Sequence, residues 1–293
     1  MYIDDVIGGT PLVQLQRIPK NKNVQIFGKL EGQNPGGSVK DRPAYYMIKG
    51  ALERGEIRPG DKLVEATSGN TGIALAMMAR LLNVEMTLIM PDNATAERVK
   101  TMKAYGAKVI LTPAAKNIEY SRELADKMAA EEGYSILNQF SNPDNYNAHY
   151  KTTGPEIWKD TAGKITHFVS AMGTTGTIMG VSRYLKGQSA DVQIVGCQPD
   201  GESSIPGIRR WSPEFLPAIF EPERVDRTID VSQEEAVKMS RRLAAEEGIL
   251  AGMSSGGALA CALKLAEELD SGLIVFIVCD RGDRYLSSDL FEG

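Results

Sequence analysis

The stretch Asn34-Pro35-Gly36-Gly37-Ser38-Val39-Lys40-Asp41-Arg42 lies near the start of the 293-residue chain and indicates where its first long helix begins. A proline and two glycines end an extended run. Ser38 occupies a position typical of an N-cap, and Asp41 three residues later completes a capping-box pattern. The pattern therefore predicts a helix that starts at Ser38, runs to about Arg54 and holds Lys40 in its first turn.

Lys40 stands at the end of the predicted helix that disfavours a cation. The unsatisfied N–H groups of a helix N-terminus carry partial positive charge, and Arg42 adds a second positive charge close by. Both disfavour the ammonium form of Lys40 and make the neutral amine more available, which is the form that reacts with an aldehyde. This stretch alone slightly favours the other interpretation, a solvated lysine at an exposed helix end.

The composition is that of an ordinary globular protein. Hydrophobic residues make up 42% and charged residues 24%, and 33 basic against 38 acidic residues give a net charge of −5. These values are close to the averages for folded domains, and the length suits two domains or one large α/β unit. The two signs of charge are interspersed without a long basic run, so neither nucleic acid nor an anionic membrane surface is an expected partner.

Several features predict a cytoplasmic protein without a metal site. Asp4 and Asp5 stand where a secretory signal carries basic residues, and the longest apolar run, Leu273 to Cys279, is too short to span a bilayer. The three cysteines are widely spaced, which fits reduced thiols. The chain has two histidines and no CxxC pair, so we expect no metal.

Apolar runs of strand length alternate with amphipathic segments of helix length, which predicts parallel sheets flanked by helices. The strands are expected at 12–17, 24–31, 62–67, 86–90, 108–112, 134–137, 166–171, 192–197 and 273–280. Helices are expected at 71–82, 94–105, 118–130, 149–158, 177–185, 233–246 and 258–269, in addition to the one at Lys40. The polar cluster from Ser141 to Asn145 is the best candidate for a domain boundary. The Pro-rich stretch from Pro199 to Pro222 is an unusually long loop, and such loops are usually functional.

Three clusters of glycine and hydroxyl residues fall where strands give way to helices: Thr67 to Thr71, Gly173 to Thr177, and Ser254 to Gly257. Each places N–H groups and hydroxyls at a helix N-terminus, which suits an anion, although such residues are also ordinary turn formers. The middle cluster lacks the lysine of a nucleotide phosphate loop and is not a complete GxGxxG fingerprint. A phosphate held by dipoles and hydroxyls serves as an anchor, and pyridoxal phosphate offers that anchor together with an aldehyde for a lysine.

Together, the SVKDR core around Lys40, TSGNTG from Thr67, GTTGT from Gly173 and SSGG from Ser254 resemble the cysteine synthases, the O-acetylserine sulfhydrylases of the tryptophan synthase β-like group. The likeness covers nearly the whole chain, and the stretches at 204–211 and 279–285 are similar to the B-type members. The resemblance implies an α/β fold of type II: two domains, each with a twisted, mostly parallel sheet flanked by helices, and pyridoxal 5'-phosphate in the cleft between them. The smaller, mobile domain is expected at 35–145, and the larger one at 1–34 and 146–293.

The resemblance also implies the roles of individual residues. Lys40 carries the cofactor as a Schiff base and moves the substrate's α-proton, Asn70 bonds the ring hydroxyl, and Ser255 faces the pyridine nitrogen. The residues expected to hold the phosphate are Gly173, Thr174, Thr175, Gly176 and Thr177. The residues expected to bind substrates are Thr67, Ser68, Gly69, Thr71, Gln139, Arg210, Cys279 and Asp280.

The activity implied is a two-stage β-replacement that makes L-cysteine from O-acetyl-L-serine and sulfide, and S-sulfocysteine from thiosulfate, in a homodimer. Arg210 is expected to bind an oxyanion of thiosulfate or O-phosphoserine, whereas its sequence context alone favours a surface arginine. Two alternatives stay open: another lyase of this fold type, such as a cystathionine β-synthase or a serine/threonine dehydratase, and a non-catalytic, cofactor-binding partner of serine acetyltransferase. The sequence does not decide between sulfur donors or between acyl donors.

Overall fold

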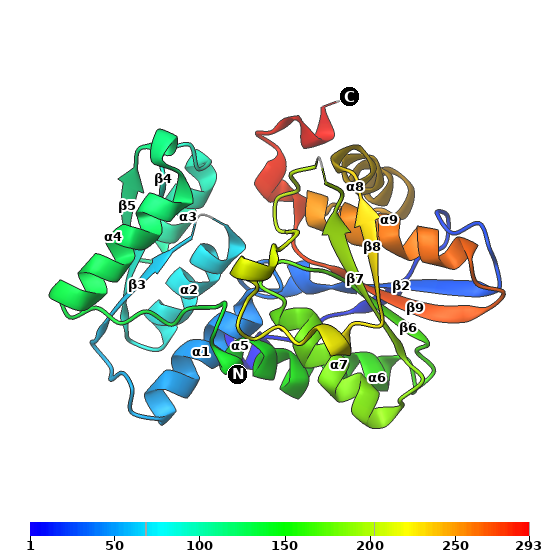
Figure 1. Cartoon of the computed structure of the whole chain (residues 1–293), viewed down its shortest axis with the longest axis horizontal. Coiled ribbons are helices and arrows are strands. Elements are labelled where there is room, and N and C mark those ends of the chain that lie inside the picture. Colours follow the sequence, from blue (N-terminus) through cyan, green and yellow to red (C-terminus); the bar gives the residue numbers. More distant parts are fainter. Residues whose placement is uncertain (68, 202, 293) are drawn as a thin grey trace. The chain divides into compact units, whose positions relative to one another are not determined.

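The computed structural model describes residues 1–67, 69–201 and 203–292 of the chain (Figure 1). These described residues divide into two compact units. Unit 1 consists of Met1–Ile7 and Lys40–Asn145, and unit 2 of Gly8–Val39 and Tyr146–Gly293. No helix among the described residues is both long enough and apolar enough to cross a membrane.

Unit 2 contains a sheet that, in the described part of the chain, has six strands in the order β1-β2-β9-β6-β7-β8. β1 pairs antiparallel with β2 at the edge, and the remaining neighbours are parallel. The strands are β1 (Leu12–Gln14), β2 (Val24–Leu30), β6 (His167–Ala171), β7 (Gln193–Pro199), β8 (Arg227–Val231) and β9 (Gly272–Val278). The α-helices that follow residue 142 are α5 (Pro143–Ala148), α6 (Gly154–Asp160), α7 (Gly176–Gln188), α8 (Gln233–Glu247) and α9 (Met253–Glu267).

Unit 1 contains a parallel sheet whose described strands follow the order β3-β4-β5. Its strands are β3 (Lys62–Ala66), β4 (Glu85–Pro91) and β5 (Lys108–Thr112), and its helices are α1 (Asp41–Glu53), α2 (Asn70–Leu81), α3 (Ala96–Ala104) and α4 (Asn117–Glu131). Short 3-10 helices occur at Ile3–Val6, Glu31–Gln33, Ala114–Lys116, Pro213–Phe215, Pro222–Arg224, Gly282–Tyr285 and Asp289–Phe291. Parallel sheets flanked by helices confirm the predicted α/β class.

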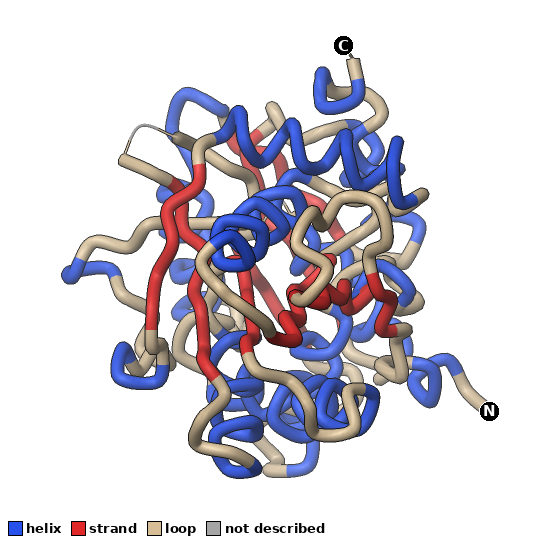
Figure 2. The backbone as a smooth tube through the Cα atoms, turned by 90° about the vertical axis from the view of Figure 1, so that its right-hand side faces the viewer, coloured by secondary structure: helices blue, strands red, loops and turns tan. Residues whose placement is uncertain are grey.

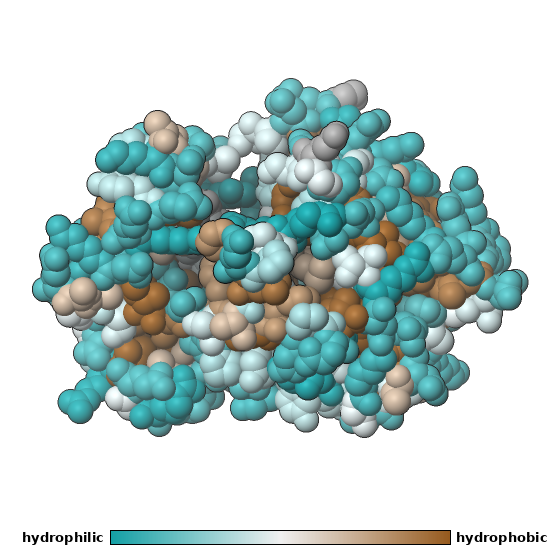
Figure 3. Space-filling view, in the orientation of Figure 1, coloured by the Kyte–Doolittle hydropathy of each residue, from teal (hydrophilic) through white to brown (hydrophobic). Residues whose placement is uncertain are grey.

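The central strand β9 shows why its run of apolar residues becomes a strand with two buried faces. Alternate side chains of a strand point to opposite faces of the sheet. Ile274 and Phe276 pack in the core formed with α8 and α9, whereas Val275 and Ile277 pack in the core that contains α7 residues. The sheet is therefore covered by helices on both faces, as the tube view shows (Figure 2), and the face drawn in Figure 3 is mostly hydrophilic with smaller apolar areas.

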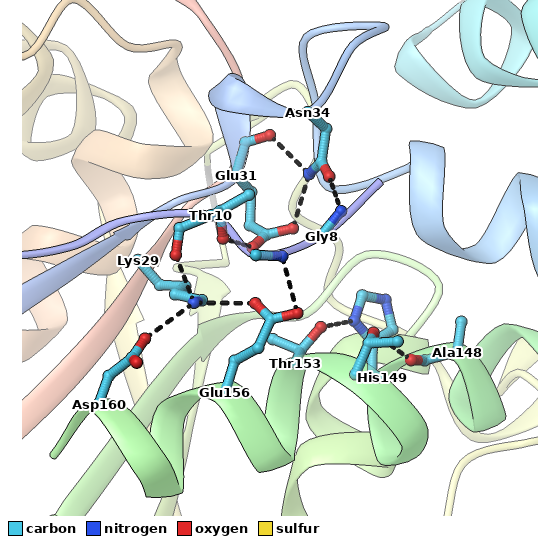
Figure 4. A network of polar contacts seen from close by, with 12 residues as sticks. Gly8, Thr10, Lys29, Glu31, Asn34, Ala148, His149, Thr153, Glu156 and Asp160 are labelled. Carbon is cyan, nitrogen blue, oxygen red and sulfur yellow. Dashed lines mark hydrogen bonds and ion pairs between the residues drawn. The ribbon is translucent and has the colours of Figure 1, made fainter. Parts of the chain in front are cut away.

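Buried charges tie the start of unit 2 together (Figure 4). The ammonium of Lys29, fully buried, donates to the Thr10 carbonyl at 2.6 Å and pairs with Glu156 of α6 at 2.9 Å. The carboxylate of Glu31, also fully buried, accepts hydrogen bonds from the Thr10 hydroxyl at 2.6 Å and from the Asn34 side-chain amide at 2.9 Å. Because buried charges are tolerated only when they are paired and hydrogen-bonded, these contacts fix Asn34, the first residue of the stretch that leads to Lys40.

The predicted N-cap at Ser38 is wrong. α1 begins at Asp41, and Lys40 is the residue immediately before its first turn. Ser38 instead pairs as an isolated bridge with Asp280, and the N–H of Val39 donates to the Cys279 carbonyl at 2.8 Å. The chain therefore runs extended past the end of β9 before the helix starts, a tertiary pairing that the local pattern does not reveal.

Two other predicted elements need correction, and one strand was not predicted. The strand expected at 134–137 is reduced to an isolated bridge between Leu63 and Ser135. The helix expected at 149–158 is a π-helix, His149–Thr153, followed by α6. The strand β8 was missed because only the last four residues of its sequence, Arg-Thr-Ile-Asp-Val, alternate polar and apolar side chains.

Candidate active site

The loop between β6 and α7, which we call the cup, leads into the N-terminus of α7 in unit 2. Thr175 is the N-cap residue of α7, so the unsatisfied N–H groups of the first turn begin here. Thr175 has a φ of 71°, in the left-handed region, and its side chain is 3% exposed. Its buried Oγ1 has no hydrogen-bond partner among the described residues. A strained backbone and an orphaned buried hydroxyl at a helix N-terminus fit a ligand with acceptor oxygens.

The Pro-rich segment from Pro199 to Pro222 lies against this cup. The indole N–H of Trp211 donates to the Gly173 carbonyl at 2.8 Å. A Cβ placed on Gly173 would come within 2.7 Å of the Gly207 carbonyl oxygen. The glycine at the start of the cup therefore permits a close backbone approach that any side chain would prevent.

His149 supports the cup from the neighbouring π-helix. Its Nε2 lies 3.3 Å from the Thr177 hydroxyl and its Nδ1 lies 2.8 Å from the Thr153 hydroxyl. Irregular π-turns inside helices are frequent at functional sites. The sequence analysis gave His149 no role, although its being one of two histidines in the chain is a signal that could have singled it out.

Ser255 is a buried hydroxyl donor near the start of α9. That helix begins at Met253, so the Ser-Ser-Gly-Gly cluster lies in its first turns and the expected start at Ala258 is wrong. Ser255 is fully buried, and its Oγ accepts the backbone N–H of Cys279 at 2.9 Å. Because the oxygen already accepts a bond, the hydroxyl proton remains for donation to an acceptor such as a ring nitrogen.

Cys279 and Asp280 follow β9, which ends at Val278. Asp280 is fully buried, and its carboxylate accepts the Gly252 N–H at 3.1 Å and the Tyr285 hydroxyl at 2.6 Å. Gly252 is the N-cap residue of α9. Asp280 thus fixes the start of the helix that carries Ser255, and the expected contacts of Cys279 and Asp280 with substrate stay predictions.

In unit 1, the loop from Thr67 leads into the N-terminus of α2. Gly69 is the N-cap residue and Asn70 the first residue of that helix, whereas Ser68 lies outside the described residues. The Thr71 hydroxyl donates to the side-chain oxygen of Gln139 at 2.9 Å. The structure therefore brings together two of the residues expected to bind the substrate carboxylate, beside a helix N-terminus that suits an anion.

Lys40 and Arg210 are two predicted site residues that lie in different units. Lys40 is half-buried in unit 1, where its carbonyl accepts the first helical hydrogen bond of α1, from Ala44 at 3.0 Å. Arg210 lies in unit 2, where its guanidinium pairs with Asp230 at 2.6 Å and donates to the Pro199 carbonyl at 3.0 Å. Arg210 is therefore already paired with a carboxylate, and its binding of an oxyanion stays a prediction.

A family model described as pyridoxal-phosphate dependent enzyme matches residues 3–280 of the chain. The chain belongs to this family. Its members use pyridoxal 5'-phosphate, so the chain is an enzyme dependent on that cofactor. The cup around Thr175, with its orphaned hydroxyl, fits the phosphate of the cofactor, and the Ser255 hydroxyl fits the pyridine nitrogen.

Proteins with similar sequences and structures cover almost the whole chain. Cysteine synthase B of Pseudomonas aeruginosa is 59% identical over 99% of this chain and 97% of its own length. Cysteine synthase B of Escherichia coli K12 is 55% identical over 99% of this chain and 95% of its own. The crystal structure of cysteine synthase from Entamoeba histolytica has a TM-score of 0.94 at 39% identity, covering 100% of this chain and 90% of its own.

Glu65 is a functional candidate that the sequence analysis missed. It lies in β3 just before the Thr67 loop and is 7% exposed. Its Oε1 accepts the N–H groups of Leu137 at 2.9 Å and Asn138 at 2.8 Å, beside Gln139. Burial raises the pKa of Glu65 to about 7, although the two N–H donors oppose the shift. A lone acidic residue inside an apolar strand was the available signal.

The raised pKa of Glu65 predicts a pH-dependent stability. The folded state holds this proton up to about pH 7, whereas an unfolded glutamate releases it near its ordinary value of 4.5. Stability therefore falls as the pH rises from 4.5 to 7, by about 3 kcal/mol in total. Thermal melts of the wild type and of Glu65→Gln at pH 5 and pH 8 measure this. The melting temperature of the wild type, relative to that of the variant, should be lower at pH 8 than at pH 5. A constant difference between the two proteins would contradict it.

Proposed function

We propose that this enzyme is a cysteine synthase, which replaces the acetoxy group of O-acetyl-L-serine with the sulfur of hydrosulfide to give L-cysteine and acetate. The observation that carries the proposal is the similarity, over nearly the full length, to proteins named cysteine synthase B. The chain also offers a candidate for each group that this reaction requires: a lysine before α1, a polar loop at α2, the cup at α7 and a serine in α9.

When bound, pyridoxal phosphate supplies an aldehyde that combines with amines and a ring that withdraws electrons from the substrate's α-carbon. The amine of Lys40 is the group in this chain that can hold the aldehyde and then accept the α-proton. Acetate would leave the β-carbon once Lys40 has taken the α-proton, and Lys40 would return that proton to the α-carbon when hydrosulfide adds at the β-carbon. Because acetate leaves before hydrosulfide enters, the reaction should show ping-pong kinetics.

The remaining groups bind and orient. Thr71, Gln139 and the N–H groups that begin α2 would hold the substrate carboxylate by charge-assisted hydrogen bonds. The hydroxyl of Ser255 is neutral, so it does not force a proton onto the pyridine nitrogen as a carboxylate would. A ring without that proton withdraws electrons more weakly, which favours prompt loss of a β-substituent.

Product analysis tests the proposal. The holoenzyme with O-acetyl-L-serine and sulfide should form cysteine and acetate in equal amounts. Pyruvate without cysteine would favour a dehydratase, and cystathionine formed from homocysteine in preference to cysteine from sulfide would favour a cystathionine β-synthase. Tight binding to serine acetyltransferase without turnover would favour a non-catalytic partner, and a colourless protein that takes up no pyridoxal phosphate would end the enzyme proposal.

We further propose that Arg210 binds the sulfonate end of thiosulfate, so that S-sulfocysteine is a second product. Arg210→Ala should then reduce kcat/KM with thiosulfate by about tenfold or more, because it removes one charge-assisted hydrogen-bonding group. It should change kcat/KM with sulfide by less than about twofold. Steady-state kinetics with each donor measure this. Arg227→Ala, which removes an exposed arginine paired with Glu268, is the control, and equal losses with both donors would exclude the role. The same assay with O-phosphoserine tests whether Arg210 accepts that phosphate.

The proposal also includes a cytoplasmic homodimer. Three free cysteines among the described residues, two of them buried, agree with a reducing compartment. Sedimentation of the holoenzyme at micromolar concentration should give twice the chain mass, and a single-chain mass would remove the dimer from the proposal.

A further inference from the structure

Glu65 occupies a position that is costly for a carboxylate. It stands in β3 between Val64, which is fully buried, and Ala66, and it pairs in register with Leu88 of β4. Placing an ionisable group in such an apolar surrounding costs free energy unless strong hydrogen bonds offset it. None of the roles described for the cofactor or the substrate uses this carboxylate, so it needs another explanation.

The hydrogen bonds of Glu65 all lead to the segment that carries Gln139. One oxygen accepts both the Leu137 and the Asn138 N–H, and Asn138 has a φ of 50°, in the left-handed region. This turn presents two adjacent N–H groups to one anion, and such nests bind negative charge well. The stretch at 134–137 is not a strand in this structure. The N–H groups of Leu137 and Asn138 therefore bond to the Glu65 side chain, where strand residues would bond to the carbonyls of a neighbouring strand.

The other side of the segment is held by amides. The Asn142 side chain donates to the Leu137 carbonyl at 2.9 Å, and the Asn145 side chain donates to the Gln139 carbonyl at 2.7 Å. With Glu65 on the N–H groups, the backbone on both sides of Gln139 is fixed. The Gln139 side chain is 9% exposed and accepts the Thr71 hydroxyl.

We propose that Glu65 is a positioning residue: its carboxylate holds the Leu137–Asn138 turn so that Gln139 meets Thr71 in the geometry that binds the α-carboxylate of the amino-acid substrate. This deepens the proposed function and rests on it. β3 thus contributes to the proposed carboxylate-binding site in two ways. It leads into the Thr67 loop, and through Glu65 it positions the turn that carries Gln139 toward Thr71.

The hold of Glu65 on the Leu137–Asn138 turn should depend on whether its carboxyl group is ionised. Asp126 of α4, which packs on β3, is the charged neighbour that acts on Glu65, and it raises the pKa further. Two cations of the same elements lie against aromatic rings: Arg122 of α4 is 5.5 Å from the Phe140 centroid, and Lys62 of β3 is 5.6 Å from the Tyr134 centroid. Below pH 7 the neutral acid accepts the two N–H bonds more weakly than the carboxylate does.

The test uses Glu65→Gln in the holoenzyme, with L-serine as the probe because it carries the same α-carboxylate. L-serine binding is followed by the shift of the cofactor's visible absorption band. At pH 8 the variant should bind L-serine about tenfold more weakly than the wild type, the loss typical of exchanging a charged for a neutral acceptor. The ratio of the two dissociation constants should approach 1 at pH 5.5, because the wild type is then neutral too.

A structural defect alone would behave differently. Ser121→Ala is the matched control, because it removes a buried hydrogen bond to Thr112 in the same unit, at 2.8 Å, that involves neither Glu65 nor Gln139. It should lower the melting temperature while leaving L-serine binding and its pH dependence as in the wild type. In a Gln139→Ala background, Glu65→Gln should add little further loss.

Three results would overturn the positioning role: wild-type binding by Glu65→Gln at pH 8, a weakening that does not change with pH, or a loss that persists in full in the Gln139→Ala background. The proposed function fails separately, if no cysteine forms from O-acetyl-L-serine and sulfide. L-serine binding still decides the role of Glu65 in that case.

Discussion

Lys40→Ala is expected to lower the rate of cysteine formation by about 10²- to 10⁴-fold, the range typical of a side chain that carries a proton transfer. The substitution takes away the one amine proposed both to hold the cofactor's aldehyde and to move the α-proton. The cup at Thr175, which is proposed to hold the phosphate, lies in unit 2 and does not include Lys40. The variant should therefore still bind pyridoxal phosphate, but without a covalent link to the chain.

Borohydride reduction separates the two effects. In the wild type it should fix the cofactor on the peptide that contains Lys40, and in Lys40→Ala the protein should release all cofactor on denaturation. Lys49→Ala is the control, because Lys49 lies on the same helix α1 with its side chain 46% exposed. Cofactor fixed on another lysine, or more than a tenth of the wild-type rate in Lys40→Ala, would remove Lys40 from its assigned role.

The parts of the fold that could be predicted from the sequence are those set by local periodicity. The apolar run at 273–280 gave β9 within two residues at its end, because its side chains are buried on both faces and the pattern needs no partner to be recognised. The segment at 134–137 forms only a bridge to β3, between Ser135 and Leu63, and its Leu137 N–H bonds to the side chain of Glu65. Pairing of this kind depends on residues distant in sequence, which periodicity does not contain.

The candidate site shows the same division. Loops at helix N-termini could be predicted from glycines and hydroxyls, and the structure places the cup at α7 and the polar loop at α2. The residues that set these loops were not predicted: Glu65 holds the turn beside Gln139, and His149 contacts Thr177 through a π-helix. Such contacts arise only when separate elements pack, so they follow from the structure.

Gly173→Ala is expected to weaken pyridoxal phosphate binding by about 10- to 100-fold, because a side chain there cannot be accommodated without moving the cup. The new Cβ would lie 2.7 Å from the Gly207 carbonyl oxygen, and no rotamer relieves the contact because the backbone fixes the positions of both atoms. Overpacking of this kind costs about 1–3 kcal/mol. The Trp211 indole bond to the Gly173 carbonyl couples the Pro-rich segment to the same movement.

Equilibrium titration of the apoprotein with pyridoxal phosphate measures this loss, and the melting temperature of the apoprotein reports any general destabilisation. Gly187→Ala is the matched control, since Gly187 lies in α7 with no atom within 4 Å of the added Cβ. It should keep wild-type affinity and gain a little stability from the higher helix propensity of alanine. Unchanged cofactor affinity in Gly173→Ala would show that Gly207 yields freely, and the phosphate would then depend on the threonines of the cup rather than on its tight closure.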